Sequence, residues 1–155
     1  MLILLYCNNL FCVEIQYFIS PYFFKNPHSY SINGLQNYKY NLGELLNEAF
    51  LEKTNIYKKC LDQEKSDYIV NLMPSTFYNP ALQTISTNLK VRVYFNDRQT
   101  INLFIKHENQ VFLNENNNKV ITEHFSKLID LLSTELLNLN FGHSKIDGAI
   151  CKIFP

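Results

Sequence analysis

The sequence has no excess of positive charge. Its 14 lysines and arginines are balanced by 14 aspartates and glutamates, and Lys58 and Lys59 form the only adjacent basic pair. Proteins that bind nucleic acid usually carry a basic surface that neutralises phosphate. The charge balance therefore argues against a nucleic-acid partner.

The sequence is also poor in glycine and in the motifs of catalysis. Its four glycines are too scattered for a phosphate-binding loop, no G-x-S-x-G is present, and no two cysteines have C-x-x-C spacing. No histidine lies four residues from another, so we expect surface histidines rather than a metal site. The sequence predicts no catalytic residue, no metal ligand and no cofactor. The residues concerned are Gly34, Gly43, Gly142 and Gly148, and His28, His107, His124 and His143.

A long hydrophobic run is missing as well. Residues 1–6 are apolar, but Asn8 and Asn9 follow, far short of the roughly 20 apolar residues that span a bilayer. A complete secretory signal would have a basic region and a longer apolar stretch. Residues 1–12 are therefore either the remnant of a signal or anchor that starts upstream, or a buried first strand. Any membrane association would be through a lipid anchor at most.

The four cysteines leave the compartment open. In an oxidising compartment Cys60 and Cys151 could pair, although the sequence cannot establish this. In the cytosol all four, Cys7 and Cys12 included, would be small buried hydrophobic residues.

Two segments have the periodicity of helices that face a core. Over residues 41–53 the apolar side chains recur at helical spacing, and Asn41 can cap the first turn with Glu44 three residues on. The glutamates of this segment fall on its wet face. The start of the helix could hold an anion on its free N–H groups, but a simple cap explains it better. Residues 120–139 form the second helix, which Gly142 is placed to end. The apolar stripes are Leu42, Leu45, Leu46, Ala49 and Phe50, and Ile121, Phe125, Leu128, Ile129, Leu132, Leu136 and Leu139.

Alternation of apolar and polar residues predicts the strands. Residues 89–95 and 101–105 alternate on either side of an Asn-Asp turn, which is typical of an antiparallel hairpin with one wet face. We also predict strands at 13–19, 56–60, 67–73 (ended by Pro74) and 149–154, a long loop over 25–39 and an aromatic turn over 77–80. Residues 111–113 could extend the sheet. The sequence thus predicts a single α+β domain over residues 13–155. It would be a two-layer sandwich with a mostly antiparallel or mixed sheet and both helices on one face.

Some aromatic residues lie outside these periodic patterns. Two groups follow prolines: Tyr22, Phe23 and Phe24 after Pro21, and Phe77 and Tyr78 after Pro74. Aromatic residues in loops can form a partner-binding surface, or they can cover the ends of the core. Both interpretations remain open at this point.

Several short motifs together resemble a known family. They are Tyr38–Asn41 before the first helix, the helix itself, the strand start Ser66–Val70 and the segment Val91–Asp97. In this order they are similar to the auxiliary lipoprotein component of ABC-type transporters, over roughly residues 13–140. The sequence lacks the tryptophan that this family usually has where the helix starts. Tyr6 and Phe11 precede Cys7 and Cys12, where a lipidation signal has a small residue, so lipidation at Cys7 or Cys12 is a hypothesis.

The resemblance implies a non-enzymatic periplasmic protein. Such a protein would be tethered to the outer membrane and would assist lipid transport together with MCE-type or permease partners. Related periplasmic lipoprotein domains share this order of elements. Two alternatives from other classes remain: a small hydrolase or transferase whose site is assembled from distant loops, and a cytosolic interaction domain with reduced cysteines. The ligand and the oligomeric state are not determined by the sequence.

Overall fold

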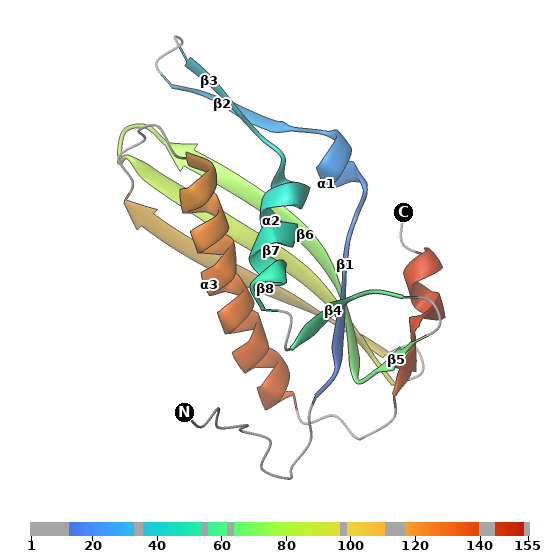
Figure 1. Cartoon of the computed structure of the whole chain (residues 1–155). Helices are drawn as coiled ribbons and strands as arrows, with labels where there is room; N and C mark the ends of the chain where they lie inside the picture. Colours follow the sequence, from blue (N-terminus) through green and yellow to red (C-terminus); the bar gives the residue numbers. More distant parts are fainter. Residues whose placement is uncertain are drawn as a thin grey trace, which may run out of the picture.

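The computed structural model describes residues 13–32, 36–53, 56–61, 64–96, 99–110, 117–139 and 145–153. Figure 1 shows their arrangement, and the chain order of the elements is as follows. They are β1 (Ile15–Ile19), α1 (Tyr22–Lys25), β2 (His28–Ile32), β3 (Gln36–Tyr40), α2 (Leu42–Leu51), β4 (Tyr57–Lys59), β5 (Lys65–Ser66), β6 (Tyr68–Asn79), β7 (Thr84–Phe95), β8 (Gln99–Gln110), α3 (Asn117–Asn138), β9 (Ile146–Asp147) and the 3₁₀ helix η1 (Gly148–Ile153).

The main sheet is mixed and has the strand order β4-β1-β6-β7-β8. β1 runs parallel to both of its neighbours, whereas β6, β7 and β8 form an antiparallel meander. The predicted hairpin is confirmed, although both of its strands are longer than their alternating segments. Asn96 follows β7 with a φ of 42°, a left-handed conformation that asparagine tolerates better than most residues.

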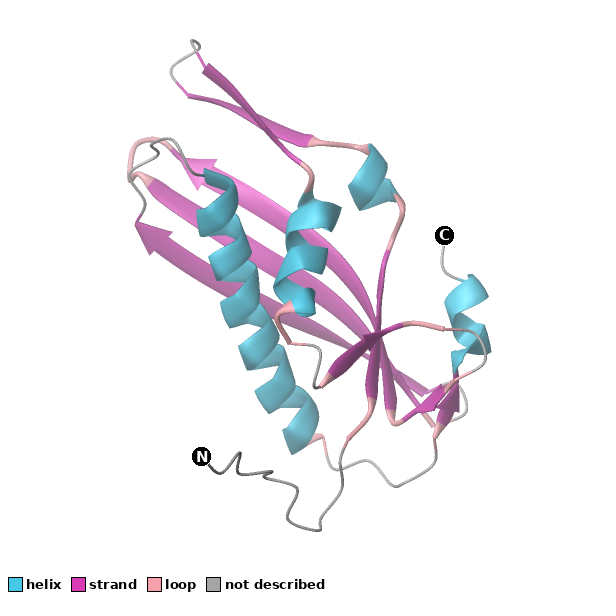
Figure 2. Ribbon diagram, in the orientation of Figure 1, coloured by secondary structure: helices cyan, strands magenta, loops and turns pink. Residues whose placement is uncertain are grey.

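α2 and α3 cover one face of this sheet (Figure 2) and pack against each other. Every residue of the predicted α2 stripe is buried, and so are the α3 stripe residues from Ile121 to Leu136. They meet the inward side chains of β6 and β7, among them Val70, Leu72, Val91 and Val93. The molecule is therefore an α+β two-layer sandwich, as the two helical stripes and the hairpin predicted.

β6 passes through Pro74, so the prediction that the strand ends there was wrong. β1 ends at Ile19, which pairs with Leu72. Beyond that point β6 has a neighbour of the main sheet on one side only, where Pro74 pairs with Leu89 of β7. A proline fits such a strand because its missing N–H can face the side with no strand. The predicted aromatic turn over 77–80 was also wrong. Because β6 continues through Pro74 to Asn79, Phe77 and Tyr78 lie in this strand.

Residues 25–39 are not the predicted loop. β2 and β3 pair as an antiparallel hairpin from His28 opposite Tyr40 to Ile32 opposite Gln36, and this arm projects beyond the end of the main sheet (Figure 1). Its apolar residues do alternate with polar ones, Tyr30 and Ile32 on β2 and Tyr38 and Tyr40 on β3, and Tyr40 is buried in the core. The loop was predicted because Pro27, Gly34 and the asparagines and serines of this segment are typical of one.

The C-terminal segment also differs from its prediction. In place of a strand over 149–154, β9 pairs with β5 and η1 follows directly. Gly148 allows this path: a Cβ there would lie 1.9 Å from the carbonyl oxygen of Leu61. The predictions for Gly142 and for residues 111–113 lie outside the described residues. α3 itself ends at Asn138, and the Leu139 carbonyl accepts a hydrogen bond from the Tyr68 hydroxyl (2.7 Å).

Candidate functional site

The first aromatic group forms the short helix α1 at the end of β1. Pro21 and Ser20 start it, with the Phe23 N–H donating to the Ser20 carbonyl oxygen (3.0 Å). Phe23 and Phe24 pack against the core, whereas Tyr22 is 62 % exposed. The core-covering interpretation is therefore confirmed for two of the three residues, and partner binding by Tyr22 stays a prediction. Phe23 and Phe24 cover the end of the core, and the Tyr22 side chain is exposed.

Asn41 and Gly43 hold α1 against the first turn of α2. The Asn41 side chain accepts a hydrogen bond from the Glu44 N–H (3.1 Å), which confirms the predicted cap. Its amide group also donates to the Phe24 carbonyl oxygen (2.7 Å). A Cβ at Gly43 would lie 2.9 Å from the backbone of Phe23, so only glycine permits this close approach.

We expect Asn41→Ala to lower the free energy of unfolding by about 1 kcal/mol through loss of the cap and to loosen α1 as well. Asn41→Asp is the matched variant, because it keeps the acceptor for Glu44 but cannot donate to Phe24. Denaturant unfolding measures the loss of stability. Hydrogen exchange at the Phe24 and Lys25 amides measures how far α1 is loosened. Equal exchange in the parent and the Asp variant would show that this hydrogen bond does not hold α1.

The second aromatic group is not joined to the first. β1 ends level with Leu72, and β6 continues from there to Asn79, so Phe77 lies well beyond the end of β1. In Figure 1 α1 and the end of β6 are at separate corners of the molecule. Phe77 is 62 % exposed, and Tyr78 is half-buried. The sequence left open whether these aromatics are exposed or cover the core, and it did not predict their distribution over two separate surfaces.

A pocket adjoins α1 that the sequence did not predict. It has a volume of about 390 Å³ and lies where β4 ends beside β1. The Tyr17 hydroxyl at its inner side donates to Asn47 of α2 (3.1 Å), and the Tyr17 ring stacks on Phe50 at 4.3 Å. Burial raises the pKa of Tyr17, which therefore remains a neutral donor. The lining residues are Tyr17, Phe18, Ile19, Pro21, Phe24, Lys25, Asn47, Lys59 and Cys60.

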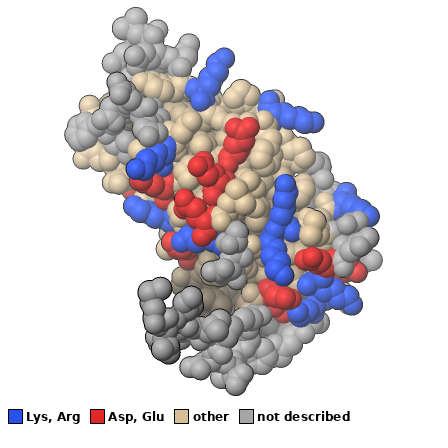
Figure 3. All heavy atoms as spheres, viewed as in Figure 1, with Lys and Arg blue, Asp and Glu red and all other residues tan. Residues whose placement is uncertain are grey.

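Acidic side chains gather on a different part of the surface, over α2 and the neighbouring part of α3 (Figure 3). Glu44, Glu48 and Glu52 are exposed, as predicted for the wet face of α2. A groove of about 550 Å³ between the two helices is lined by four carboxylates and two lysines: Glu48, Glu52, Glu123 and Asp130, and Lys119 and Lys127. Lys53 forms an ion pair with Asp130 (2.6 Å). These exposed charges form a solvated face.

Two histidines, the buried His124 and the half-buried His107, are in contact, and the burial of His124 corrects the prediction of surface histidines. His124 of α3 is 2 % exposed, and its Nδ1 lies 3.2 Å from the Thr87 hydroxyl of β7. Its ring meets the ring of His107 on β8 edge-on at 4.7 Å, and His107 pairs directly with Thr87. Burial, together with His107 and Lys127, lowers the pKa of His124 to about 4. The two histidines are 17 residues apart, and no local motif indicated their contact.

This histidine pair predicts that stability falls in mild acid. His124 is neutral in the folded protein down to about pH 4, whereas in the unfolded chain it binds a proton below about pH 6.5. The free energy of unfolding is therefore fully retained above pH 6.5 and declines as the pH falls from 6.5 to about 4, by roughly 2–3 kcal/mol. His107, whose pKa is lowered mainly by burial, adds to the same trend.

Denaturant unfolding from pH 4 to pH 7 tests this expectation. His124→Gln should flatten the profile, and His28→Gln on the β2–β3 arm should leave it unchanged. A His124→Gln profile as steep as that of the parent would assign the acid sensitivity to other groups.

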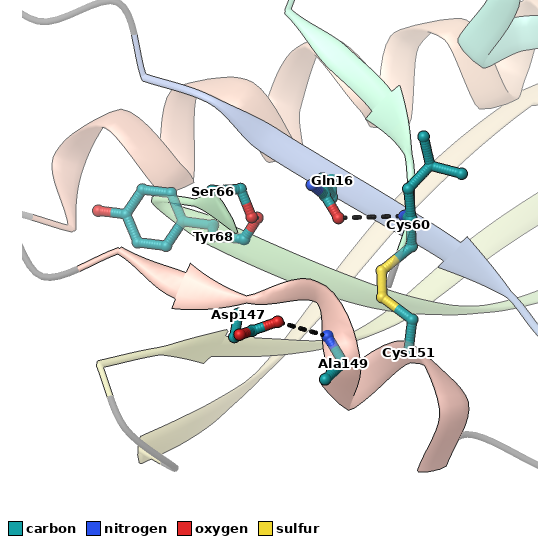
Figure 4. Close-up of a disulfide and its surroundings, with 8 residues drawn as sticks. Gln16, Cys60, Ser66, Tyr68, Asp147, Ala149 and Cys151 are labelled. Carbon is teal, nitrogen blue, oxygen red and sulfur yellow. Dashed lines mark hydrogen bonds between the residues drawn. A yellow bond between two sulfur atoms is a disulfide. The ribbon is translucent and has the colours of Figure 1, made fainter. Parts of the chain in front are cut away.

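Cys60 and Cys151 form a disulfide with a Cα–Cα distance of 6.2 Å. Figure 4 shows how it joins the end of β4 to η1, which lies across β1 and β6 with helix α3 on the far side of the strands. Gln16 and Ile69 are buried on this face, and the Gln16 side chain accepts a hydrogen bond from the Leu61 N–H (3.3 Å). The disulfide thus holds η1 over one end of the otherwise open sheet face. Cys7 and Cys12 lie outside the described residues.

The described residues contain neither a metal-binding cluster nor a membrane-spanning helix. No three side chains of His, Cys, Asp or Glu there are grouped so that they could hold a metal ion. None of the described helices has the length and apolar character needed to cross a bilayer.

The fold and these features define a two-layer α+β protein with a disulfide, a projecting β arm and a small apolar pocket. No protein-family model matches the chain, and no curated protein sequence matches it either. It is similar to a crystal structure of an uncharacterized protein at 11 % identity and a TM-score of 0.51, over 79 % of this chain and 90 % of the other. It also aligns with rare lipoprotein B from Shewanella oneidensis at 10 % identity and a TM-score of 0.40, over 83 % of this chain and 99 % of the other. At 11 % identity the first likeness shows the fold alone.

Proposed function

We propose that the chain is a non-enzymatic periplasmic accessory protein of an ABC-type system that transports lipid or other envelope components. The observation that carries the proposal is the disulfide between Cys60 and Cys151. Disulfides persist in oxidising compartments and are rare in the cytosol. The link to ABC-type transport depends on the sequence resemblance described above.

A docking surface at α1 fits this role. Tyr22 presents an exposed aromatic ring on a helix whose neighbours Phe23 and Phe24 are anchored in the core. A rigid, anchored aromatic side chain loses little conformational entropy when a partner covers it, and tyrosine is enriched among the residues that dominate interface energies. The expected partner is the permease or the MCE-type protein of the system.

Cross-linking and purification of a tagged chain expressed at native level test the proposal. An MCE-type or permease protein should co-purify, and Tyr22→Ala should reduce its yield. Tyr22, Phe77 and Phe104 are each 62 % exposed, so Phe77→Ala and Phe104→Ala are matched controls at other surfaces. Equal yields from all three variants would exclude these aromatics as the interface. A purified complex without any transport component would contradict the proposed function.

Cell fractionation and metabolic labelling with a fatty-acid analogue test the compartment and the anchor. The proposal expects an oxidised chain in the envelope. If the chain is lipidated, the label should be on Cys7 or Cys12. An unlabelled soluble chain with reduced cysteines in the cytosol would favour a cytosolic interaction domain instead.

A further inference from the structure

The pocket beside α1 lies where two neighbouring strands end at different levels. β4 pairs with β1 only from Ile15 to Tyr17, and the last hydrogen bond between the two segments is from the Cys60 N–H to the Tyr17 carbonyl oxygen (2.9 Å). β1 continues to Ile19 before it turns into α1. The space beside the end of β1 is bordered by α1 on one side and by Lys59 and Cys60 on the other.

The disulfide explains why β4 does not extend along β1 and fill this space. Cys60 is bonded to Cys151 of η1, which lies on the sheet face opposite α2 (Figure 4). The next residue, Leu61, hydrogen-bonds to Gln16, further back along β1. The chain therefore turns away from the end of β1 at Cys60. The disulfide and these hydrogen bonds therefore hold the end of β4 away from the space beside the end of β1.

The pocket combines an apolar interior with a basic border. Tyr17, Ile19 and Phe24 supply aromatic and aliphatic surface, and the lining contains two lysines, Lys25 and Lys59, but no carboxylate. Among the described residues, neither lysine forms a salt bridge. Two polar grooves elsewhere on the described surface both contain glutamates. Of these three sites, this one alone joins a largely apolar lining to two lysines without a carboxylate.

From this combination we infer that the pocket binds a single hydrocarbon chain that carries an anionic headgroup, with the chain against Phe24 and Ile19 and the headgroup at Lys25 and Lys59. A volume of about 390 Å³ is near the lower end of the roughly 300–1,000 Å³ typical of small-molecule sites. It accommodates one short chain or the end of a longer one, rather than a whole bilayer lipid. The inference deepens the proposed function, and it depends on that function only for the biological source of the ligand.

Calorimetry with the purified, oxidised chain tests the inference directly. The ligands are decanoate, decyl phosphate and decyltrimethylammonium, each below its micellar concentration. Decanoate and decyl phosphate should bind and the cation should not. The ratio of the dissociation constants of decanoate and decyl phosphate distinguishes a fatty-acid-like headgroup from a phosphate headgroup. Binding should weaken as salt is added, because the lysines are at the exposed border of the pocket.

Two variants assign binding to this pocket. The double variant Lys25→Gln, Lys59→Gln should have a dissociation constant for decanoate at least about tenfold higher than that of the parent. The control, Lys90→Gln with Lys106→Gln, removes two exposed lysines from β7 and β8 and should have no effect. Phe24→Ala should weaken binding of both anionic ligands, and a thermal melt checks that it remains folded.

Equal affinity for the cation, or unchanged binding after removal of Lys25 and Lys59, would overturn the inference. If decanoate does not bind while a transport protein still co-purifies with the chain, the inference falls and the proposed function stands.

Discussion

Leu45→Asp is expected to unfold the domain at room temperature. Leu45 lies in the middle of the α2 stripe, is 7 % exposed and belongs to the core between the helices and the sheet. The substitution removes an apolar side chain from this core and places a carboxylate there. Together these changes cost about 4 kcal/mol or more, against a total stability of roughly 5–15 kcal/mol for a domain.

Leu51→Asp provides the matched control. It is the same substitution in the same helix, but Leu51 is 60 % exposed, so we expect it to change the free energy of unfolding by less than about 1 kcal/mol. Circular dichroism and thermal melts of both variants measure the difference. A cooperative melt of Leu45→Asp near the parent temperature would show that the α2 stripe is not buried.

Removal of the disulfide is expected to have the second-largest effect. The bond joins residues separated by 91 positions, so it restricts most of the chain in the unfolded state. Its loss should lower the free energy of unfolding by roughly 2–4 kcal/mol. Locally, η1 should separate from the sheet, which would expose Ile69 and Gln16 to solvent.

Denaturant unfolding of the double variant Cys60→Ser, Cys151→Ser measures this effect. Each single variant should be as unstable as the double variant, because either one breaks the bond. Reductant should bring the parent to the same stability and leave the double variant unchanged. A parent protein that is equally stable with and without reductant would show that the disulfide contributes little.

The elements that the sequence predicted well are those whose pattern is set by the core. The α2 and α3 stripes and the β7–β8 hairpin face one continuous core, and burial selects apolar residues at the spacing of a helix or a strand. The β2–β3 arm was missed although its tyrosines alternate with polar residues, because Pro27, Gly34 and the nearby asparagines and serines are typical of a loop. Pro74 led to the wrong end for β6. A proline ends a strand where both neighbours need its N–H, but β1 stops at Ile19, so β6 has a neighbour on one side only at Pro74.

Residues that meet only in three dimensions could not be predicted in the same way. His107 and His124 belong to different elements, and their contact follows from the packing of α3 on β8. The pocket needs the end of β4, α1 and α2 together, with Lys25 and Lys59 brought to one border. The sequence left open whether Cys60 and Cys151 are paired or reduced. Their pairing depends on the position of η1 over β1 and β6.

The sequence by itself determined the class of this protein: an α+β domain with two amphipathic helices, a β-hairpin and a balanced charge. These properties depend on local periodicity and composition, which each segment carries independently of the others. The tertiary structure alone decided the rest: the tethering of η1, the contact of His107 with the buried His124, the separation of the aromatics onto two surfaces, and the pocket. Each of these depends on which distant segments come into contact, and that is set by the packing of the whole chain around one core.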